Sequence, residues 1–174
     1  VAAEASNLRT PGPQDGRVHQ ALAYALDRRP LLAYLQRGFA RPANSLLPPE
    51  RWAYTGDVPA YDHDPARARQ LLEQAGYPEV NGVRFHLTMK SSTEESTRLM
   101  AAVLQQQLRQ VGIALDISTF EFATFFSDVT HGLFQVYSLR WIGGNEDPEI
   151  LEYVFHPSKF PPNGANRGYF ADPR

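Results

Sequence analysis

Hydrophobic residues recur at the three- and four-residue spacing of an amphipathic helix in several stretches, and with strand-like spacing or composition in others. The stretches with helical spacing are residues 15–26, 30–35, 65–75, 93–111, 122–129 and 148–155. The stretches with strand character are residues 1–7, 83–89, 113–118 and 134–139. Strands therefore alternate with helices, which predicts an α/β or mixed α+β class with a sheet layered by helices, and one domain over residues 1–174.

Acidic residues stand where several of these helices are expected to begin. Asp15 can cap the first helix, while Asp64 and Asp147 are each followed by proline, which suits the first helical position. Gly76 and Gly112 supply stop signals for the helices before them. These boundaries support the assignment of the helices.

The stretch from 139 to 148 joins an apolar strand to a helix start through a glycine-rich turn. Gly143 and Gly144 are followed by an amide and two acids before the proline. In α/β proteins, ligands bind at the carboxyl ends of strands, where such turns occur. A connection that uses glycine only for its backbone angles explains the same residues. The local pattern leaves both interpretations open.

Composition narrows the function classes. The chain has 174 residues, a net charge of −2 and scattered basic residues, which give no case for a nucleic-acid partner. It has no cysteine, so disulfides, zinc thiolates and cysteine nucleophiles are excluded. No apolar run is long enough to span a membrane, and Val1 begins no recognisable signal peptide. We therefore expect any export signal to lie outside this sequence.

Motifs for catalysis are absent from the sequence. The five histidines share no metal-ligand spacing, no serine lies in a nucleophile elbow, and the glycine pair lacks the lysine of a phosphate loop. Glu146 is the one acid near the glycine pair that capping does not explain, and a carboxylate-dependent hydrolase using Glu146 is an alternative function. We expect no catalytic residue, no metal site and no cofactor.

Three stretches resemble, in the same order, the family 5 extracytoplasmic solute-binding proteins, which are the dipeptide- and oligopeptide-binding components of ABC importers. The first runs from Asn7 to Arg28 and ends in an aspartate-arginine pair. The second begins with Pro42-Ala-Asn, continues through Leu47-Pro-Pro and ends in Leu-Leu-Glu-Gln-Ala-Gly-Tyr77. The third is the Trp141-to-Pro148 loop, which resembles the family's tryptophan loop ending in Asp-Pro. Together they cover nearly the whole chain.

The resemblance implies a two-lobed protein of the type II periplasmic-binding fold that closes on its ligand. This chain would be most of the second, C-terminal lobe, without the N-terminal lobe. The implied partners are a peptide or small solute, an ABC permease in the membrane and the N-terminal lobe of the same polypeptide. The implied location is periplasmic or extracellular, and the family has no catalytic activity. A sensor or interaction lobe without transport is a further alternative.

The resemblance at the loop makes Trp141, Gly144 and Glu146 candidate ligand-binding residues. Trp141 matches the tryptophan whose ring contributes to the ligand pocket. In the peptide binders, an aspartate three positions later pairs with the α-amino group of the ligand, a charge-assisted contact that is costly to lose in a desolvated site. This chain has Gly144 there. Glu146 can reach the same amine instead, or the ligand lacks a free ammonium group.

Three further candidates complete the expected site. Arg140, immediately before the tryptophan, can receive a carboxylate or another anionic group, and an ion pair at the surface explains it equally well. Gly143 allows close approach of the backbone to the ligand. Asn7 is expected at a strand end near the hinge between the lobes.

Overall fold

The computed structural model describes residues 2–6, 14–35, 42–43, 45–140 and 147–171, with residues 2–6, 34–35 and 140 described by their backbone alone. The strands are β1 (Ala2–Ser6), β2 (Phe85–Ser92), β3 (Ile113–Phe120) and β4 (Val136–Arg140). The helices are α1 (Gly16–Ala25), α2 (Arg28–Pro30), the π-helical turn η1 (Leu31–Leu35), α3 (Pro65–Gln74), α4 (Glu95–Arg109), α5 (Phe122–Thr130), α6 (Glu149–Phe155) and the 3₁₀ turn η2 (Pro157–Lys159). The segment between η1 and α3 is irregular where the structure describes it.

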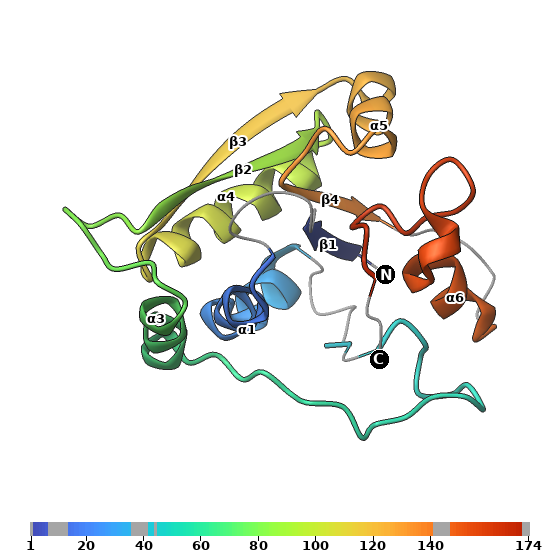
Figure 1. Cartoon of the computed structure of the whole chain (residues 1–174), viewed down its shortest axis with the longest axis horizontal. Helices are drawn as coiled ribbons and strands as arrows, with labels where there is room; N and C mark the ends of the chain where they lie inside the picture. The colour runs from blue at the N-terminus through green and yellow to red at the C-terminus, as the bar shows by residue number, and fades with distance from the viewer. Residues whose placement is uncertain (1, 7–13, 36–41, 44, 141–146, 172–174) are drawn as a thin grey trace.

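The described strands form one four-stranded sheet in the order β1-β4-β2-β3. β2 runs parallel to both β3 and β4, whereas β1 is antiparallel to β4 at the edge. Met89 pairs with Val136, and Phe85 pairs with Ile113, so the carboxyl ends of β2, β3 and β4 lie on one side. Their arrowheads point to the side on which α5 and α6 lie (Figure 1). The predicted mixed α/β class is confirmed.

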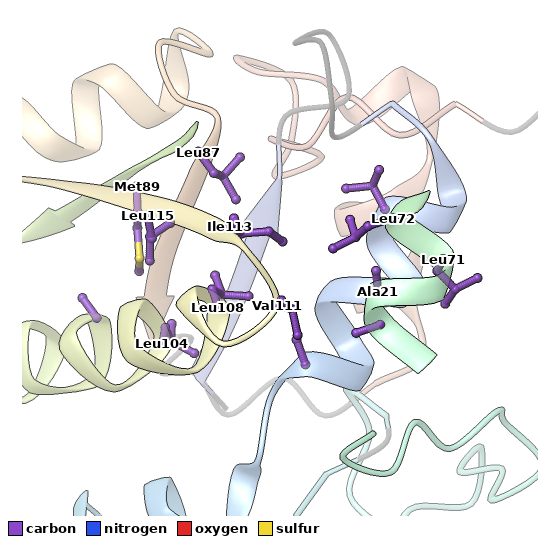
Figure 2. Close-up of a cluster of buried hydrophobic side chains, with 14 residues drawn as sticks. Ala21, Leu71, Leu72, Leu87, Met89, Leu104, Leu108, Val111, Ile113 and Leu115 are labelled. Carbon is purple, nitrogen blue, oxygen red and sulfur yellow. The ribbon is translucent and has the colours of Figure 1, made fainter. Parts of the chain in front are cut away.

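The first face of the sheet carries the main core. Alternate residues of β2 and β3 point to this face and pack on the apolar stripe of α4, with α1 and α3 packed beside it (Figure 2). The fully or nearly buried members include Val18, Ala21, Leu71, Leu72, Leu87, Met89, Leu104, Leu108, Val111, Ile113 and Leu115. The periodic hydrophobic residues noted in the sequence therefore account for this layer.

The opposite face carries a second, aromatic cluster. Phe125 and Val129 of α5 are fully buried against Phe134 and Tyr137. Val136, the neighbour of Tyr137 in β4, packs on the first core, so the two clusters lie on opposite faces of the sheet. α4 and α5 consequently cover different faces.

This arrangement follows from the strand order. The crossover from β2 to β3 runs through α4, and the crossover from β3 to β4 runs back past β2 through α5. Right-handed crossovers in opposite directions place their helices on opposite faces. The sheet therefore has a switch point between β2 and β4, where such folds open a crevice at the carboxyl ends of the strands.

The predicted helix caps are present. The Asp15 carboxylate accepts a hydrogen bond from the Arg17 amide at 2.8 Å, and the Asp64 carboxylate accepts one from the Arg67 amide at 2.9 Å. These side chains satisfy amides that have no partner within their own helix.

Three details differ from the sequence expectation. The second helix begins at Arg28 rather than Pro30, because Asp27 caps it through the Arg29 amide at 3.0 Å. In α6, only Ile150 is buried; Leu151 and Phe155, two other apolar residues of the 148–155 stretch whose helical spacing predicted a buried face, are exposed. The short helix has few elements to pack against in the described part of the chain. Leu99 belongs to the 93–111 stretch, whose helical spacing predicted an apolar stripe on the core, and it is also exposed.

Helices long and apolar enough to cross a lipid bilayer do not occur in the described part of the chain.

Candidate functional site

The carboxyl edge of the three parallel strands is the candidate site. β2 ends at Ser92, β3 at Phe120 and β4 at Arg140, and the chain turns from these ends into α4, α5 and the segment before α6. The ends of β2 and β4 border the switch point of the sheet. The sequence-predicted loop therefore leaves the sheet at the position where this topology places ligands.

Most of the predicted ligand-binding residues lie outside the described residues. These are Asn7, Trp141, Gly143, Gly144 and Glu146. Their roles stay predictions.

The backbone of Arg140, the sixth predicted residue, ends β4 and pairs with Ala2 of β1. Ser6, which precedes Asn7, pairs with Val136. Four residues of strand, about 13 Å, separate these two positions. The register thus puts the residue before Asn7 and the residue before Trp141 at opposite ends of the β1–β4 pair.

The far end of the loop is fixed by Asp147. Its carboxylate accepts a hydrogen bond from the Glu149 amide at 3.0 Å, and its carbonyl oxygen accepts one from the Ile150 amide at 3.1 Å. Both bonds satisfy amides at the start of α6. The capping role predicted for Asp147 is confirmed.

An aromatic pair, of which Phe122 is exposed and Phe126 partly buried, lies next to this edge. Phe122 is the first residue of α5, directly after β3, and 58% of its surface is exposed. Its ring stacks on that of Phe126, with centroids 5.8 Å apart and planes 18° apart. The sequence pattern predicted a short helix over residues 122–129 and did not single out Phe122 as a candidate ligand contact. The signal was available, because four apolar residues in one short helix exceed what one buried stripe requires.

A mostly buried ion pair holds α5 on the sheet. The Lys90 ammonium lies 2.6 Å from the Asp128 carboxylate, with about a fifth of each side chain exposed. The same ammonium lies 5.2 Å from the centroid of the Phe120 ring. Together with the buried Phe125 and Val129, these contacts fix the rotation of α5 and hence the direction in which Phe122 projects.

The arm formed by residues 156–171 folds back over α6 and reaches β4. Asn166 is buried, and its amide nitrogen donates to the carbonyl oxygens of Phe155, His156 and Phe170 at 3.0, 3.2 and 2.7 Å. Arg167 places its guanidinium carbon 5.2 Å from the Phe126 ring centroid.

Tyr137 of β4 lies under this arm. Burial raises the pKa of its phenol, and the charge of Arg167 with its hydrogen bond to the phenol acts in the opposite direction. The arm therefore ties α6, α5 and β4 together beside the carboxyl edge.

Buried hydroxyl groups gather at the ends of the strands. Ser91, Ser92 and Ser138 are buried, and the hydroxyl oxygens of Ser91 and Thr119 lie 3.4 Å apart. Groups of three or more acidic, histidine or cysteine side chains that could hold a metal ion do not occur in the described ranges. The groups that could contact a ligand in the described part of this edge are hydroxyl groups, aromatic rings and one guanidinium.

The sequence profile of the family "Bacterial extracellular solute-binding proteins, family 5 Middle" matches residues 5–161. The chain belongs to this family. Its members are substrate-binding components of transport systems rather than enzymes, and the resemblance stated from the sequence is confirmed.

Individual relatives agree with this assignment. The chain is 31% identical over 169 residues to the probable di/tripeptide-binding protein 5 of Pseudomonas aeruginosa, which covers 97% of this chain and 32% of the relative. It is 30% identical over 135 residues to heme-binding protein A of Haemophilus influenzae, covering 76% of this chain and 24% of the relative. The chain thus spans between about a quarter and a third of the length of these relatives.

A solved structure gives the same fold. The oligopeptide-binding protein AppA from Bacillus subtilis, in complex with a nonapeptide, superposes with a TM-score of 0.90 at 24% identity, over 99% of this chain and 36% of that protein. The fold is therefore that of part of a type II periplasmic-binding protein, as the sequence predicted.

Proposed function

We propose that the chain forms most of the second ligand-binding lobe of an ABC-importer solute-binding protein. It takes a peptide or a peptide-like small solute and closes on it together with an N-terminal lobe of the same polypeptide. The complete protein acts in the periplasm or on the outer side of the cell membrane and delivers its ligand to a permease. The observation that carries this proposal is the position of the exposed Phe122, stacked on Phe126, at the carboxyl edge of the sheet in a member of this family.

The relatives support a peptide more than another solute, although their ligands differ. The P. aeruginosa relative is named for di- and tripeptides, and the B. subtilis structure contains a nonapeptide. The H. influenzae relative is named for heme. Proteins of one fold thus bind several classes of ligand, and the side chains that line each binding site determine which class is bound.

In this proposal the loop supplies specific contacts and α5 supplies apolar surface. Trp141 forms one wall, Gly143 and Gly144 bring backbone groups close to the ligand, and Glu146 or Arg140 provides the charged contact. Asn7 is a contact nearer the hinge. Phe122 adds an exposed ring that a ligand side chain can cover, since burying an aromatic ring is the largest apolar gain available to a small ligand.

The experiment compares Phe122→Ala with Leu133→Ala in the complete protein. Leu133 follows α5 at its other end and is 59% exposed, almost the same as Phe122, so both substitutions remove a similar exposed side chain. Ligand is first identified by mass spectrometry of what co-purifies, and its affinity is then measured by calorimetry. We expect Phe122→Ala to weaken binding about tenfold, which corresponds to the apolar area of one ring, and Leu133→Ala to leave it unchanged. Equal effects of Phe122→Ala and Leu133→Ala on the affinity would mean that the ligand does not contact Phe122 at the carboxyl edge of the sheet.

A second experiment addresses Gly144. In the peptide binders the corresponding aspartate pairs with the amino group of the ligand, so Gly144→Asp should strengthen binding of free-amine peptides over their N-acetylated forms. Calorimetry with Ala-Ala and N-acetyl-Ala-Ala measures this ratio. An unchanged ratio in the variant means that Gly144 does not set the preference for an amine.

A further inference from the structure

Arg167 differs from Arg17 and Arg84 in that no carboxylate pairs with it in the described part of the chain. Arg84, which is almost fully buried, has the Glu73 carboxylate 2.5 Å away and the Glu79 carboxylate 3.5 Å away. Arg17 pairs with Asp15 even though it is half exposed. Arg167 instead meets an aromatic ring and a phenol.

One donor of this guanidinium has no partner. The Arg167 Nε atom is buried and makes no hydrogen bond. A buried donor without an acceptor destabilises the folded protein, and a cation enclosed by rings is stabilised further when an anion approaches its planar edge. A carboxylate that displaces the side chain slightly can accept hydrogen bonds from Nε and a terminal nitrogen together.

The position of Arg167 connects it to the candidate site. Its guanidinium carbon lies 5.2 Å from the Phe126 centroid, and Phe126 stacks on the exposed Phe122 at 5.8 Å. The three side chains therefore form a row along α5 that begins at the carboxyl edge of the sheet. A ligand that covers Phe122 and continues along this row therefore approaches the guanidinium.

We propose that Arg167 is a specificity-determining residue that receives a carboxylate of the bound solute, beside the Phe122–Phe126 pair. This inference rests on the proposed function, since it assigns a role at the same site. The carboxylate can be the terminal group of a peptide or an acidic side chain, and both have the same chemistry at the guanidinium.

The test compares matched ligands with the complete protein. Ala-Ala and its C-terminal amide differ in the terminal carboxylate, and Ala-Glu and Ala-Gln differ in the side-chain carboxylate. Affinities are measured by calorimetry for the unaltered protein, for Arg167→Met and for Arg167→Lys. Arg109→Met is the control, because it removes one positive charge from an exposed position on α4.

We expect the unaltered protein to prefer the acid of one pair at least tenfold, and the pair concerned identifies the source of the carboxylate. Arg167→Met should reduce this preference to less than twofold while the affinity for the uncharged ligand stays the same. Arg167→Lys should keep part of the preference, and Arg109→Met all of it.

Two outcomes contradict the inference, and they differ. If Arg167→Met leaves the preference intact, or weakens acid and amide equally, Arg167 only supports the fold and the proposed function stands. If none of the four ligands binds to the unaltered protein, the proposed peptide-binding function is wrong, and the role inferred for Arg167 is wrong as well.

Discussion

Replacing Asn166 by aspartate tests whether the arm over α6 is held by donated hydrogen bonds. The side chain is 1% exposed, and its amide nitrogen faces three carbonyl oxygens at 2.7–3.2 Å. Aspartate has nearly the same shape, so the substitution creates no cavity. It replaces the donor by a carboxylate oxygen that cannot donate while it is ionised.

The size of the effect follows from these contacts. Two amide hydrogens serve the three carbonyl groups, and each lost bond costs about 1 kcal/mol. An ionised carboxylate oxygen would face the same three carbonyl oxygens, and leaving a buried charge uncompensated raises the cost to about 3 kcal/mol or more. For a chain of this length, a loss of about 3 kcal/mol in the free energy of unfolding corresponds to a melting temperature about 6–12 °C lower.

The effect should depend on pH. The environment raises the pKa of the introduced carboxyl in the folded state, because its protonated form can donate to a carbonyl oxygen. A raised folded pKa means that the stability gap to the unaltered protein is smallest below the unfolded value of about 4 and widens as the pH rises through the folded value. Urea denaturation followed by circular dichroism at several pH values measures this gap. Hydrogen exchange at the Phe170 amide, which donates to Asn166 Oδ1 at 2.9 Å, reports the arm itself.

Asn163→Asp provides the matched control. Asn163 lies in the same arm but is exposed, so the same charge change should alter the free energy of unfolding by less than about 0.5 kcal/mol. Asn166→Leu removes the donor without adding charge, and it should also destabilise the protein. If Asn166→Asp and Asn166→Leu both unfold at the urea concentration of the unaltered protein, the hydrogen bonds of Asn166 do not hold the arm.

Two other predictions concern the turn at Gly112 and the helix cap at Asp27. Gly112→Ala should lower the free energy of unfolding by about 1 kcal/mol more than Gly76→Ala. Both glycines have positive φ, but a Cβ atom would lie 2.9 Å from Arg84 Cγ at Gly112 and would meet nothing within 4 Å at Gly76. Equal losses of stability in urea denaturation would refute a steric contribution. The hydrogen bonds from Arg29 lower the pKa of Asp27 to about 2 from 3.8, so its contribution to stability is present above pH 3.8 and is lost as the pH falls through about 2. The stability difference between the protein and Asp27→Asn should therefore shrink over that range, and a difference that is constant with pH would contradict this linkage.

The sequence by itself determined the class of the fold and most of its elements. Helical spacing in α1, α3 and α4 and alternation in β3 reflect which side chains face the core, and this periodicity is local. Caps such as Asp64 were readable for the same reason, since a cap and its amide lie within three residues. The family was likewise visible in three motifs in their order along the chain.

The tertiary structure alone decided what faces the site. A hydrophobic residue in an amphipathic helix is buried only if another element covers it, and neither Phe122 nor Leu151 is covered in the described part of the chain. The register of β1 on β4 depends on pairing between residues more than a hundred positions apart, so no local pattern indicates that Ser6 and Arg140 lie at opposite ends of that pair. Arg167 comes near Phe126 and Tyr137 through the fold of the arm, because contacts between distant segments arise from packing and not from spacing along the chain.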